Sequence, residues 1–270
     1  MKTLILILVA CLILSPTFIL ASESEDITFT GEISTGLKRL SNETVDLVKT
    51  PFMTENGNIL ITLGFLGTVA LTYSFDTNIR SKLETTKSNG LNKAADTVSL
   101  IGDPFIHMGL SALVYGGGIA AGSAKWKETG EMMGEALILA DGSTFLLKEI
   151  SGRGRPNVTS AKGDFKPFAF KNSYDSTPSM HTSSSFALAS VLAATSESLA
   201  MKLTYYTAAT FVGFSRIYKN DHWASDVLLG AALGELCGRV VTSTHASKSK
   251  VAVIPQAYES GAGLALIGRW

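Results

Sequence analysis

Two of the four histidines in this 270-residue sequence lie in surroundings that suit catalysis. The first is His222 in "NDHWASDVLLG", where we expect Asp221 to cap a helix whose first turn carries His222. Asp226 follows four residues later on the same helix face, so its carboxylate would accept a hydrogen bond from one imidazole nitrogen. The other nitrogen would be left free to act as a base or nucleophile. An ordinary surface or capping pair is the alternative interpretation.

The second histidine, His181, lies in "TPSMHTSSSFALA" (residues 177–189). A proline and several small hydroxyl residues lead directly into an apolar run, which predicts the start of a helix. Free backbone N–H groups and a partial positive charge make a helix N-terminus suitable for an anion. Ser179 and His181 would lie at this end, unless they serve only to cap the helix.

A cluster of cations in "KEISGRGRP" (residues 148–156) is the third feature, because it interrupts a chain with equal numbers of basic and acidic residues. Lys148, Arg153 and Arg155 follow an apolar run and are separated by glycines. Three interpretations are open: a solvated helix end, an anchor at a membrane edge, or a cradle for an anion.

The three segments fall in a fixed order with characteristic internal spacings. They are Lys148 with Arg155–Pro156 after six residues, Pro178–Ser179 with His181, and Ser215–Arg216 followed by His222 and Asp226. Together they resemble the tripartite signature of the type 2 phosphatidic acid phosphatase (PAP2) superfamily, which includes bacterial class A acid phosphatases and vanadium haloperoxidases. The resemblance extends from about residue 100 to residue 241.

The resemblance implies a role for each motif residue. His222 would attack phosphorus to form a phosphohistidine, Asp226 would orient it, and His181 would protonate the leaving oxygen. The phosphate oxygens would be held by cations, a hydroxyl and a backbone N–H: Lys148, Arg155, Arg216, Ser179 and Met180. No metal or other cofactor is implied, so fixed cations would stabilise the charge of the transferred phosphoryl group. Arg153 either reaches the mouth of this site or is solvated.

Met180 departs from the family pattern, which usually has glycine at this position. If the glycine only offers its N–H, methionine can replace it provided that φ is negative. If close approach of the substrate requires glycine, the methionine side chain would narrow the pocket or shift specificity.

Apolar stretches separated by Gly, Pro and charged clusters predict the helices that position these motifs. They cover residues 59–75, 104–124, 131–148, 183–199, 203–217 and 223–241. We therefore expect an all-α, PAP2/haloperoxidase-like bundle of about six core helices. The long loop 152–180 has a composition typical of a functional loop, and "KVAVIPQAYESGAGLALIGRW" predicts a short C-terminal β-hairpin.

The domain organisation follows from the same patterns. Residues 1–21 have the charge and apolar run of a secretory signal peptide, with a retained anchor as the alternative. Residues 22–57 form a lead-in with one amphipathic helix, residues 58–245 the phosphatase-like domain, and residues 246–270 a tail or hairpin. An exported chain of this kind would be periplasmic, either soluble or associated with a membrane.

Membrane integration is judged from length and charge. Only the stretch 104–124 meets the length of roughly 20 apolar residues that a spanning helix needs, and carboxylates interrupt 131–148 and 223–241. We expect a compact helical domain that at most rests on a membrane. A six-helix integral protein with its site facing the periplasm is the alternative.

The remaining composition narrows the function classes. Net charge near zero argues against a nucleic-acid partner. Cleavage of the signal peptide would leave Cys237 alone, as a buried thiol in an apolar helix. We expect His107 in a helix near the core and His245 in a polar linker. The oligomeric state has no signal in the sequence.

The resemblance implies a metal-independent phosphatase acting on phosphate monoesters or pyrophosphates. The partner would be a phosphorylated small molecule or lipid, such as phosphatidate, phosphatidylglycerol phosphate or a polyprenyl diphosphate. A vanadium haloperoxidase is the first alternative, because vanadate resembles the phosphoryl transition state. The second is a non-catalytic envelope protein that binds lipid phosphates.

Overall fold

The computed structural model describes residues 29–54, 58–248, 252–258 and 261–267. The predicted signal peptide, residues 1–21, lies outside the described residues. The chain divides into two compact units, residues 1–38 and 39–270. The first unit is described from Phe29 onward, where it contains the beginning of helix α2 (Phe29–Lys49), the amphipathic helix expected between residues 22 and 57.

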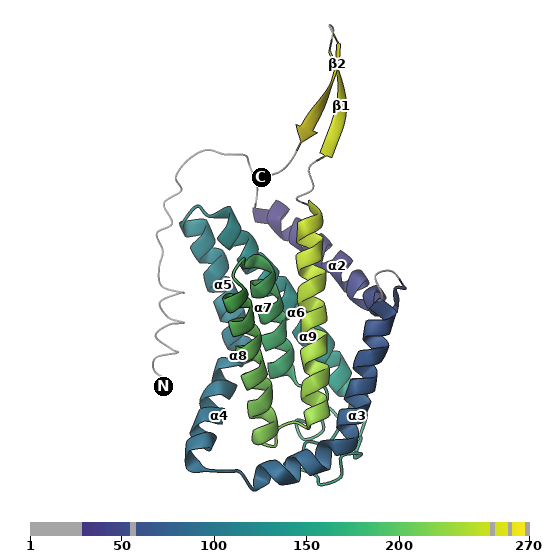
Figure 1. Ribbon diagram of the computed structural model, residues 1–270, viewed down its shortest axis with the longest axis vertical. Coiled ribbons are helices and arrows are strands. Elements are labelled where there is room, and N and C mark those ends of the chain that lie inside the picture. Colours follow the sequence, from purple (N-terminus) through teal and green to yellow (C-terminus); the bar gives the residue numbers. More distant parts are fainter. Residues whose placement is uncertain (1–28, 55–57, 249–251, 259–260, 268–270) are drawn as a thin grey trace. The chain divides into compact units, whose positions relative to one another are not determined.

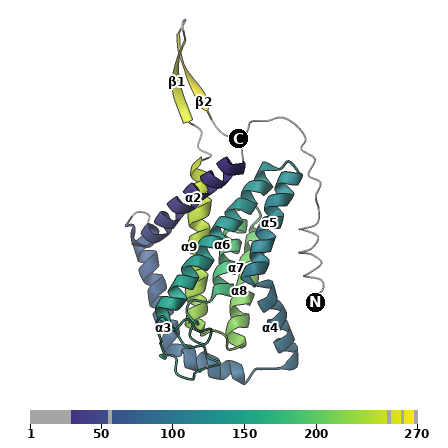
Figure 2. The same cartoon turned by 180° about the vertical axis from the view of Figure 1, so that it is seen from behind.

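The described residues of the second unit are mainly helical, which confirms the predicted all-α class. After α2 and a short 3-10 turn (Thr50–Phe52), the helices are α3 (Asn58–Glu84), α4 (Asn89–Ile101), α5 (Pro104–Ala120), α6 (Ala124–Ser151), α7 (Met180–Thr195), α8 (Leu199–Tyr218) and α9 (Ala224–Lys248). Helix α7 packs against α6, α8 and α9, and α5 packs against α6 (Figures 1 and 2). Helix α3 packs against α9, and α4 against α8.

Each of the six predicted apolar stretches corresponds to one of these helices, but α4 was not predicted. Its sequence "NGLNKAADTVSLI" is mixed, with a polar first turn, so it lacks a continuous apolar run. The Ser88 hydroxyl caps it by accepting a hydrogen bond from the Leu91 N–H. Capping by Ser88 and packing against α8 therefore stabilise a helix that the hydrophobic pattern of the sequence does not predict.

The buried core lies where α6, α7 and α9 meet, with Met133, Leu137, Val191 and Val241 among its members. Close approach of α7 and α9 depends on small residues, since a Cβ on Gly234 would overlap the Ser183 carbonyl oxygen. Cys237 is buried in this core and is not in a disulfide, as predicted.

The segment 152–179 connects α6 to α7 as a long irregular loop, as the sequence predicted. It begins at Gly152, which ends α6 in the left-handed region with φ of 55°. The Gly152 N–H donates to the Lys148 carbonyl over 2.8 Å, and a Cβ here would overlap the Lys166 carbonyl oxygen. Only glycine meets both requirements, so the turn that follows Lys148 is fixed by this residue.

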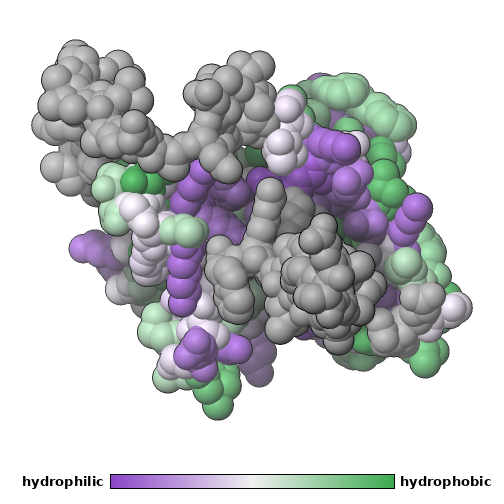
Figure 3. All heavy atoms as spheres, turned by 90° about the horizontal axis from the view of Figure 1, so that it is seen from above, coloured by the Kyte–Doolittle hydropathy of each residue, from purple (hydrophilic) through white to green (hydrophobic). Residues whose placement is uncertain are grey.

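Large apolar side chains face outward on several helices of the second unit. They include Leu60, Leu63, Leu66 and Phe75 of α3, Phe105, Leu110 and Leu113 of α5, and Leu203, Phe211 and Phe214 of α8. Seen from above, hydrophobic residues lie along much of the margin and hydrophilic residues gather between them (Figure 3).

Two of the described helices are long and apolar enough to cross a membrane: α3 and residues 224–246 of α9. Helices α4 and α5, bent by 48° where they join, would form a third crossing if they act together. This differs from our expectation that only 104–124 meets the required length, since α5 is a candidate only together with α4. Helix α3 continues for nine residues beyond the predicted stretch 59–75, and α9 keeps a sufficiently apolar window despite Asp226 and Glu235.

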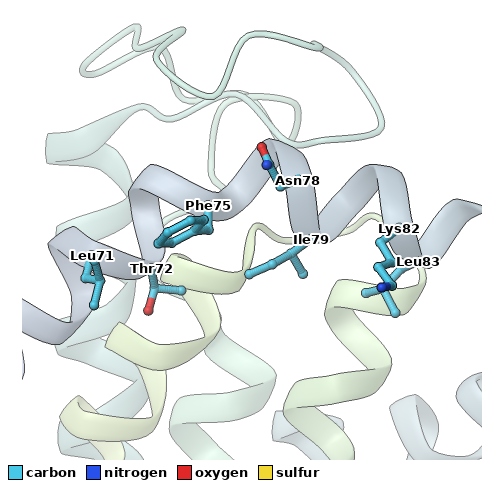
Figure 4. A pocket seen from close by; sticks show the side chains of 7 residues that line it. All are labelled: Leu71, Thr72, Phe75, Asn78, Ile79, Lys82 and Leu83. Carbon is cyan, nitrogen blue, oxygen red and sulfur yellow. The ribbon is translucent and has the colours of Figure 1, made fainter.

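Helix α3 also carries a shallow groove of about 560 Å³. Its lining comes from Leu71, Thr72, Phe75, Asn78, Ile79, Lys82 and Leu83, which lie along the helix as Figure 4 shows. Most of this lining is apolar, with one cation, Lys82, toward one end.

The C-terminal part of the chain contains the end of α9 and two strands. Strands β1 (Ala252–Tyr258) and β2 (Gly261–Ile267) pair antiparallel, with Ala252 opposite Ile267. The placement of His245 in a polar linker is wrong, because His245 is buried on α9. Its Nε2 lies 2.8 Å from Glu135 and its Nδ1 lies 3.2 Å from Glu128, so α9 runs further than its apolar pattern suggests.

Candidate active site

The three motif segments meet at one end of the bundle. Helices α6 and α8 end there, and α7 and α9 begin there (Figure 1). Because the chain alternates in direction through these four helices, Lys148, His181, Arg216 and His222 reach the same end from distant parts of the sequence. The anion cradle is therefore the interpretation of Lys148 and Arg155 that the fold favours.

His222 lies in the turn between α8 and α9 and is buried. Its Nδ1 lies 2.6 Å from the carbonyl oxygen of Ser176. A carbonyl only accepts hydrogen bonds, so Nδ1 must carry the proton and Nε2 must keep its lone pair. Burial, together with the nearby cations Lys148, Arg155 and Arg216, lowers the pKa of His222 well below its ordinary value. The imidazole is neutral at pH 7, which is the form that can attack an electrophile.

The predicted hydrogen bond between His222 and Asp226 is not formed. Helix α9 begins at Ala224, so His222 precedes it and the two residues do not share a helix face. The predicted capping role of Asp221 is also replaced, because Asp221 instead pairs with Arg216 at 2.9 Å. The imidazole is therefore oriented by the Ser176 carbonyl and not by Asp226.

Asp226 is completely buried, and its carboxylate is hydrogen-bonded to Ser176 and not to His222. Its Oδ2 accepts from the Ser176 hydroxyl at 2.5 Å and from the Trp223 N–H at 3.0 Å, and its Oδ1 accepts from the Thr177 hydroxyl. Its backbone carbonyl also accepts from the Ser179 N–H at 3.1 Å. Asp226 therefore holds the segment 176–179, and that segment holds His222.

The predicted phosphate-binding cations are each paired with acidic groups. Arg155 binds Asp175 through two nitrogens, at 2.6 and 2.9 Å. Lys148 donates to the Asp175 backbone carbonyl and lies 3.8 Å from the Asp175 carboxylate. Asp175 thus binds both of the cations that, by the PAP2 resemblance, would bind phosphate.

Arg216 is also paired with an acidic residue, but one of its nitrogen donors is left unsatisfied among the described residues. Its two terminal nitrogens contact Asp221 and the Ser99 hydroxyl. Within the described part of the chain its buried Nε has no hydrogen-bond partner. Because an unsatisfied buried donor is costly, this nitrogen favours binding of an acceptor such as a phosphate oxygen.

Burial lowers the pKa of two further motif residues. It lowers the pKa of Lys148 to about 8, so the amine at the end of α6 is still mostly charged at pH 7. Burial and then the cations Arg216 and Lys148 lower the pKa of His181 to about 3. His181 is consequently neutral at pH 7. It could donate a proton only after a bound anion had raised its pKa.

Ser179 and Met180 lie at the start of α7, as the sequence predicted. Ser179 is the N-cap residue, and Met180 is the first helical residue, so its N–H has no partner within the helix. Met180 is not among the residues with positive φ. The backbone condition for replacing the usual glycine is therefore met.

Arg153 is neither solvated nor at the mouth of the site, the two alternatives that the sequence left open. It is buried, and its guanidinium contacts both Asp226 and Asp76 of α3. Asp76 and Ser176 were not predicted as site residues. A lone carboxylate in the apolar run "ALTYSFDTNIR" is the one sequence signal that points to Asp76.

A second buried cluster lies at the other end of α6 and α9, on the order of 20 Å away by helix rise. Glu43, Glu135 and His245 bring their ligand-type atoms within 4.8 Å of one another. Both oxygens of Glu135 already face nitrogen donors, since Arg39 lies 2.6 Å from one and His245 2.8 Å from the other. This cluster is an ion-pair network remote from the motif residues.

Comparison with known proteins shows which proteins this part of the chain resembles. Residues 132–250 match the model of the PAP2 superfamily. That region contains all three motifs, and the match confirms the resemblance drawn from the sequence.

Individual relatives match part of the chain. It is 35% identical over 174 residues to a lipid A 1-phosphatase of Porphyromonas gingivalis, an alignment covering 63% of this chain and 35% of that protein. The chain thus spans about a third of the length of this curated relative. The fold resembles a transmembrane PAP2-type phosphatidylglycerolphosphate phosphatase from Bacillus subtilis, with 22% identity, a TM-score of 0.54, and coverage of 70% of this chain and 96% of that one. Aquifex aeolicus LpxE aligns over 62% of this chain and 93% of its own length, with 22% identity and a TM-score of 0.49.

The pairing of Asp175 with Arg155 and Lys148 predicts the effect of Asp175→Asn. Loss of the competing charge should tighten the binding of inorganic phosphate by roughly three- to tenfold. Titration calorimetry on the purified protein measures this. Asp164→Asn is the matched control, because Asp164 lies in the same loop but accepts from Tyr174. Weaker binding by Asp175→Asn would mean that Asp175 mainly holds Arg155 in place for the anion.

The lowered pKa of His181 predicts that stability falls in acid. In the unfolded chain this histidine binds a proton near its ordinary pKa of 6.5, whereas in the folded protein it does so only near 3. The free energy of unfolding should therefore decrease as the pH falls below about 6.5, by up to about 1.4 kcal/mol per pH unit for one proton.

Thermal melts of the wild type and of His181→Asn between pH 7.5 and 4.5 measure this difference. The variant should lose less stability than the wild type over this range. Added phosphate should also reduce the loss for the wild type, because the anion stabilises the protonated imidazole. Parallel curves for the two proteins would contradict the lowered pKa.

Proposed function

We propose that the protein is a metal-independent phosphatase that hydrolyses lipid phosphate monoesters or pyrophosphates through a phosphohistidine on His222. The hydrogen bond from His222 Nδ1 to the Ser176 carbonyl carries this proposal. It leaves Nε2 unprotonated in a site that also contains Lys148, Arg155 and Arg216. A neutral imidazole among fixed cations is suited to attack a phosphate that the cations hold.

Binding of the phosphate would be the first step. Its oxygens would take the place of the Asp175 carboxylate on Arg155 and Lys148 and would accept from Arg216 Nε and the Met180 N–H. Arg suits contacts through two nitrogens, and Lys acts as a point charge. The dianion would also raise the pKa of His181, which would then take up a proton from solvent.

Transfer of the phosphoryl group would be the second step. The Nε2 lone pair of His222 would form the N–P bond as the P–O bond to the leaving group breaks, and His181 would give its proton to the leaving oxygen. In the last step, neutral His181 would accept a proton from water while the water oxygen attacks phosphorus. The N–P bond would break, returning the lone pair to His222 and releasing inorganic phosphate.

A lipid substrate agrees with the outer surface of the protein. Helix α3 has an apolar groove that ends near Lys82, and the large apolar side chains of α5 and α8 also face outward. We propose that α3, α9 and the α4–α5 pair lie in a membrane, with the motif end facing the periplasm. The candidate substrates are phosphatidate, phosphatidylglycerol phosphate, a polyprenyl diphosphate and, from the P. gingivalis relative, the 1-phosphate of lipid A.

Phosphate release from a panel of substrates tests the proposal. The purified protein in detergent should hydrolyse at least one of the four lipids with a higher kcat/KM than p-nitrophenyl phosphate. His222→Gln should lower kcat by at least about 1,000-fold, because it removes the nucleophile. His245→Gln is the matched control, a buried histidine remote from the motifs, and should keep its turnover per folded molecule.

Three outcomes would contradict the proposal. Retained turnover by His222→Gln would exclude His222 as the nucleophile. Tight binding of vanadate with no release of phosphate from any substrate would favour a non-catalytic lipid-phosphate-binding protein. Halide oxidation that depends on added vanadate and peroxide would favour a haloperoxidase.

A further inference from the structure

Arg153 lies inside the first motif segment but has no place in the motif, and its contacts give it a position of its own. It is 2% exposed. Its Nε donates to the Lys162 carbonyl at 3.0 Å, and its Nη1 donates to the Ser225 hydroxyl at 2.8 Å and to Asp226 at 2.5 Å. Its Nη2 donates to Asp76 at 2.8 Å. Every nitrogen of the guanidinium therefore has a partner.

Asp76 connects this arginine to a helix that contains no motif residue. It lies on α3 and is almost completely buried. Besides Arg153, its carboxylate accepts from the Ser225 N–H at 2.9 Å and from the Ser225 hydroxyl at 2.6 Å. Ser225 is in the first turn of α9, directly before Asp226. Asp76 thus fixes the start of α9 and the guanidinium at the same time.

A continuous series of hydrogen bonds leads from Arg153 to His222. Arg153 binds the Asp226 carboxylate, which accepts from the Ser176 hydroxyl at 2.5 Å. The backbone carbonyl of Arg153 also accepts from the Ser176 N–H at 3.0 Å. The Ser176 carbonyl in turn accepts from His222 Nδ1 at 2.6 Å. The side chain and the backbone of Arg153 therefore both restrain the residue that sets the imidazole tautomer.

The charge and shape of Arg153 make it difficult to replace. One guanidinium lies between two buried carboxylates, and removing it would leave both without their cation. The rings of Tyr73 and Trp223 lie over it, at 4.8 and 5.3 Å from Cζ. A lysine would keep the charge but could not bridge Asp76 and Asp226 with the same planar fork.

We propose that Arg153, anchored on Asp76, is a positioning residue for His222. Through Asp226 and Ser176 it keeps the proton on Nδ1 and the lone pair on Nε2. The consequence for turnover rests on the proposed function. The consequence for the imidazole tautomer does not, and this makes the two separable by experiment.

Steady-state kinetics on the full chain test the effect on turnover. Arg153→Gln should lower kcat by about 10- to 100-fold per folded molecule and leave KM within about twofold, because the phosphate-binding cations are untouched. Arg153→Lys should recover part of this loss. Asp76→Asn should lower kcat less than Arg153→Gln, since Arg153 would still bind Asp226. The matched control is Arg80→Gln, because Arg80 stacks on the same Trp223 ring but does not contact Asp226 or Ser176.

The tautomer of His222 gives a second readout that needs no activity. In ¹⁵N-histidine NMR spectra, with the signal assigned by His222→Gln, the wild type and Arg80→Gln should show protonated Nδ1 and unprotonated Nε2. Arg153→Gln and Asp76→Asn should show a mixture of the two tautomers. Arg153→Lys should lie between these extremes, and it keeps the test possible if Arg153→Gln fails to fold.

The outcomes separate the two claims. An altered tautomer in the Arg153 and Asp76 variants supports the inference, even if the wild type releases no phosphate from any substrate, in which case the proposed function alone fails. An unaltered tautomer in these variants would overturn it. The inference would also be overturned if the kcat of the Arg153 and Asp76 variants fell only in proportion to the fraction of folded protein. An equal loss of kcat in Arg80→Gln would overturn it as well.

Discussion

The hydrogen bond between His222 Nδ1 and the Ser176 carbonyl is the contact on which the rest of the site depends. Its two partners come from different connections, the loop before α7 and the turn before α9. They meet because α7 and α9 approach closely, at positions such as Gly234, where any side chain would overlap the α7 backbone. Close packing of two helices therefore decides which imidazole nitrogen is free. Asp226 stabilises this contact without touching the imidazole. Its carboxylate accepts from the Ser176 hydroxyl, and its backbone carbonyl accepts from the Ser179 N–H.

The second constraint is electrostatic. Lys148, Arg155 and Arg216 are brought together at the same end of the bundle, and burial lowers the pKa of Lys148 to about 8 and that of His181 to about 3. Concentrating cations in this way is unfavourable unless anions accompany them. Asp175 and Asp221 fill this role, by pairing with Arg155 and Arg216. A phosphate dianion that displaced Asp175 would relieve the same unfavourable charge, which links binding to the protonation of His181.

Much of this architecture could be predicted from the sequence, and the failures share physical causes. The apolar stretches predicted most of the helices, and the spacing of Lys148, His181 and His222 predicted the residues that come together. The partner of His222 was predicted wrongly because helical spacing was assumed two residues before α9 begins. The pairing of Arg153 with Asp76 leaves no local pattern in the sequence. The two residues are 77 positions apart, and their ion pair forms only after α3 packs. The spanning length of α3 was missed because its helix continues through the polar residues after Phe75.

The imidazole nitrogen that carries the phosphoryl group during turnover shows whether the Ser176 carbonyl leaves Nε2 of His222 free to react. Rapid acid-free quenching during turnover of a ³²P-labelled substrate, followed by peptide mapping, would locate the phosphoryl group on both the chain and the imidazole ring. Since Nδ1 is held by Ser176, we expect label on Nε2 of His222 and no label at this position in His222→Gln. Label on Nδ1 of His222, or on His181, would contradict it.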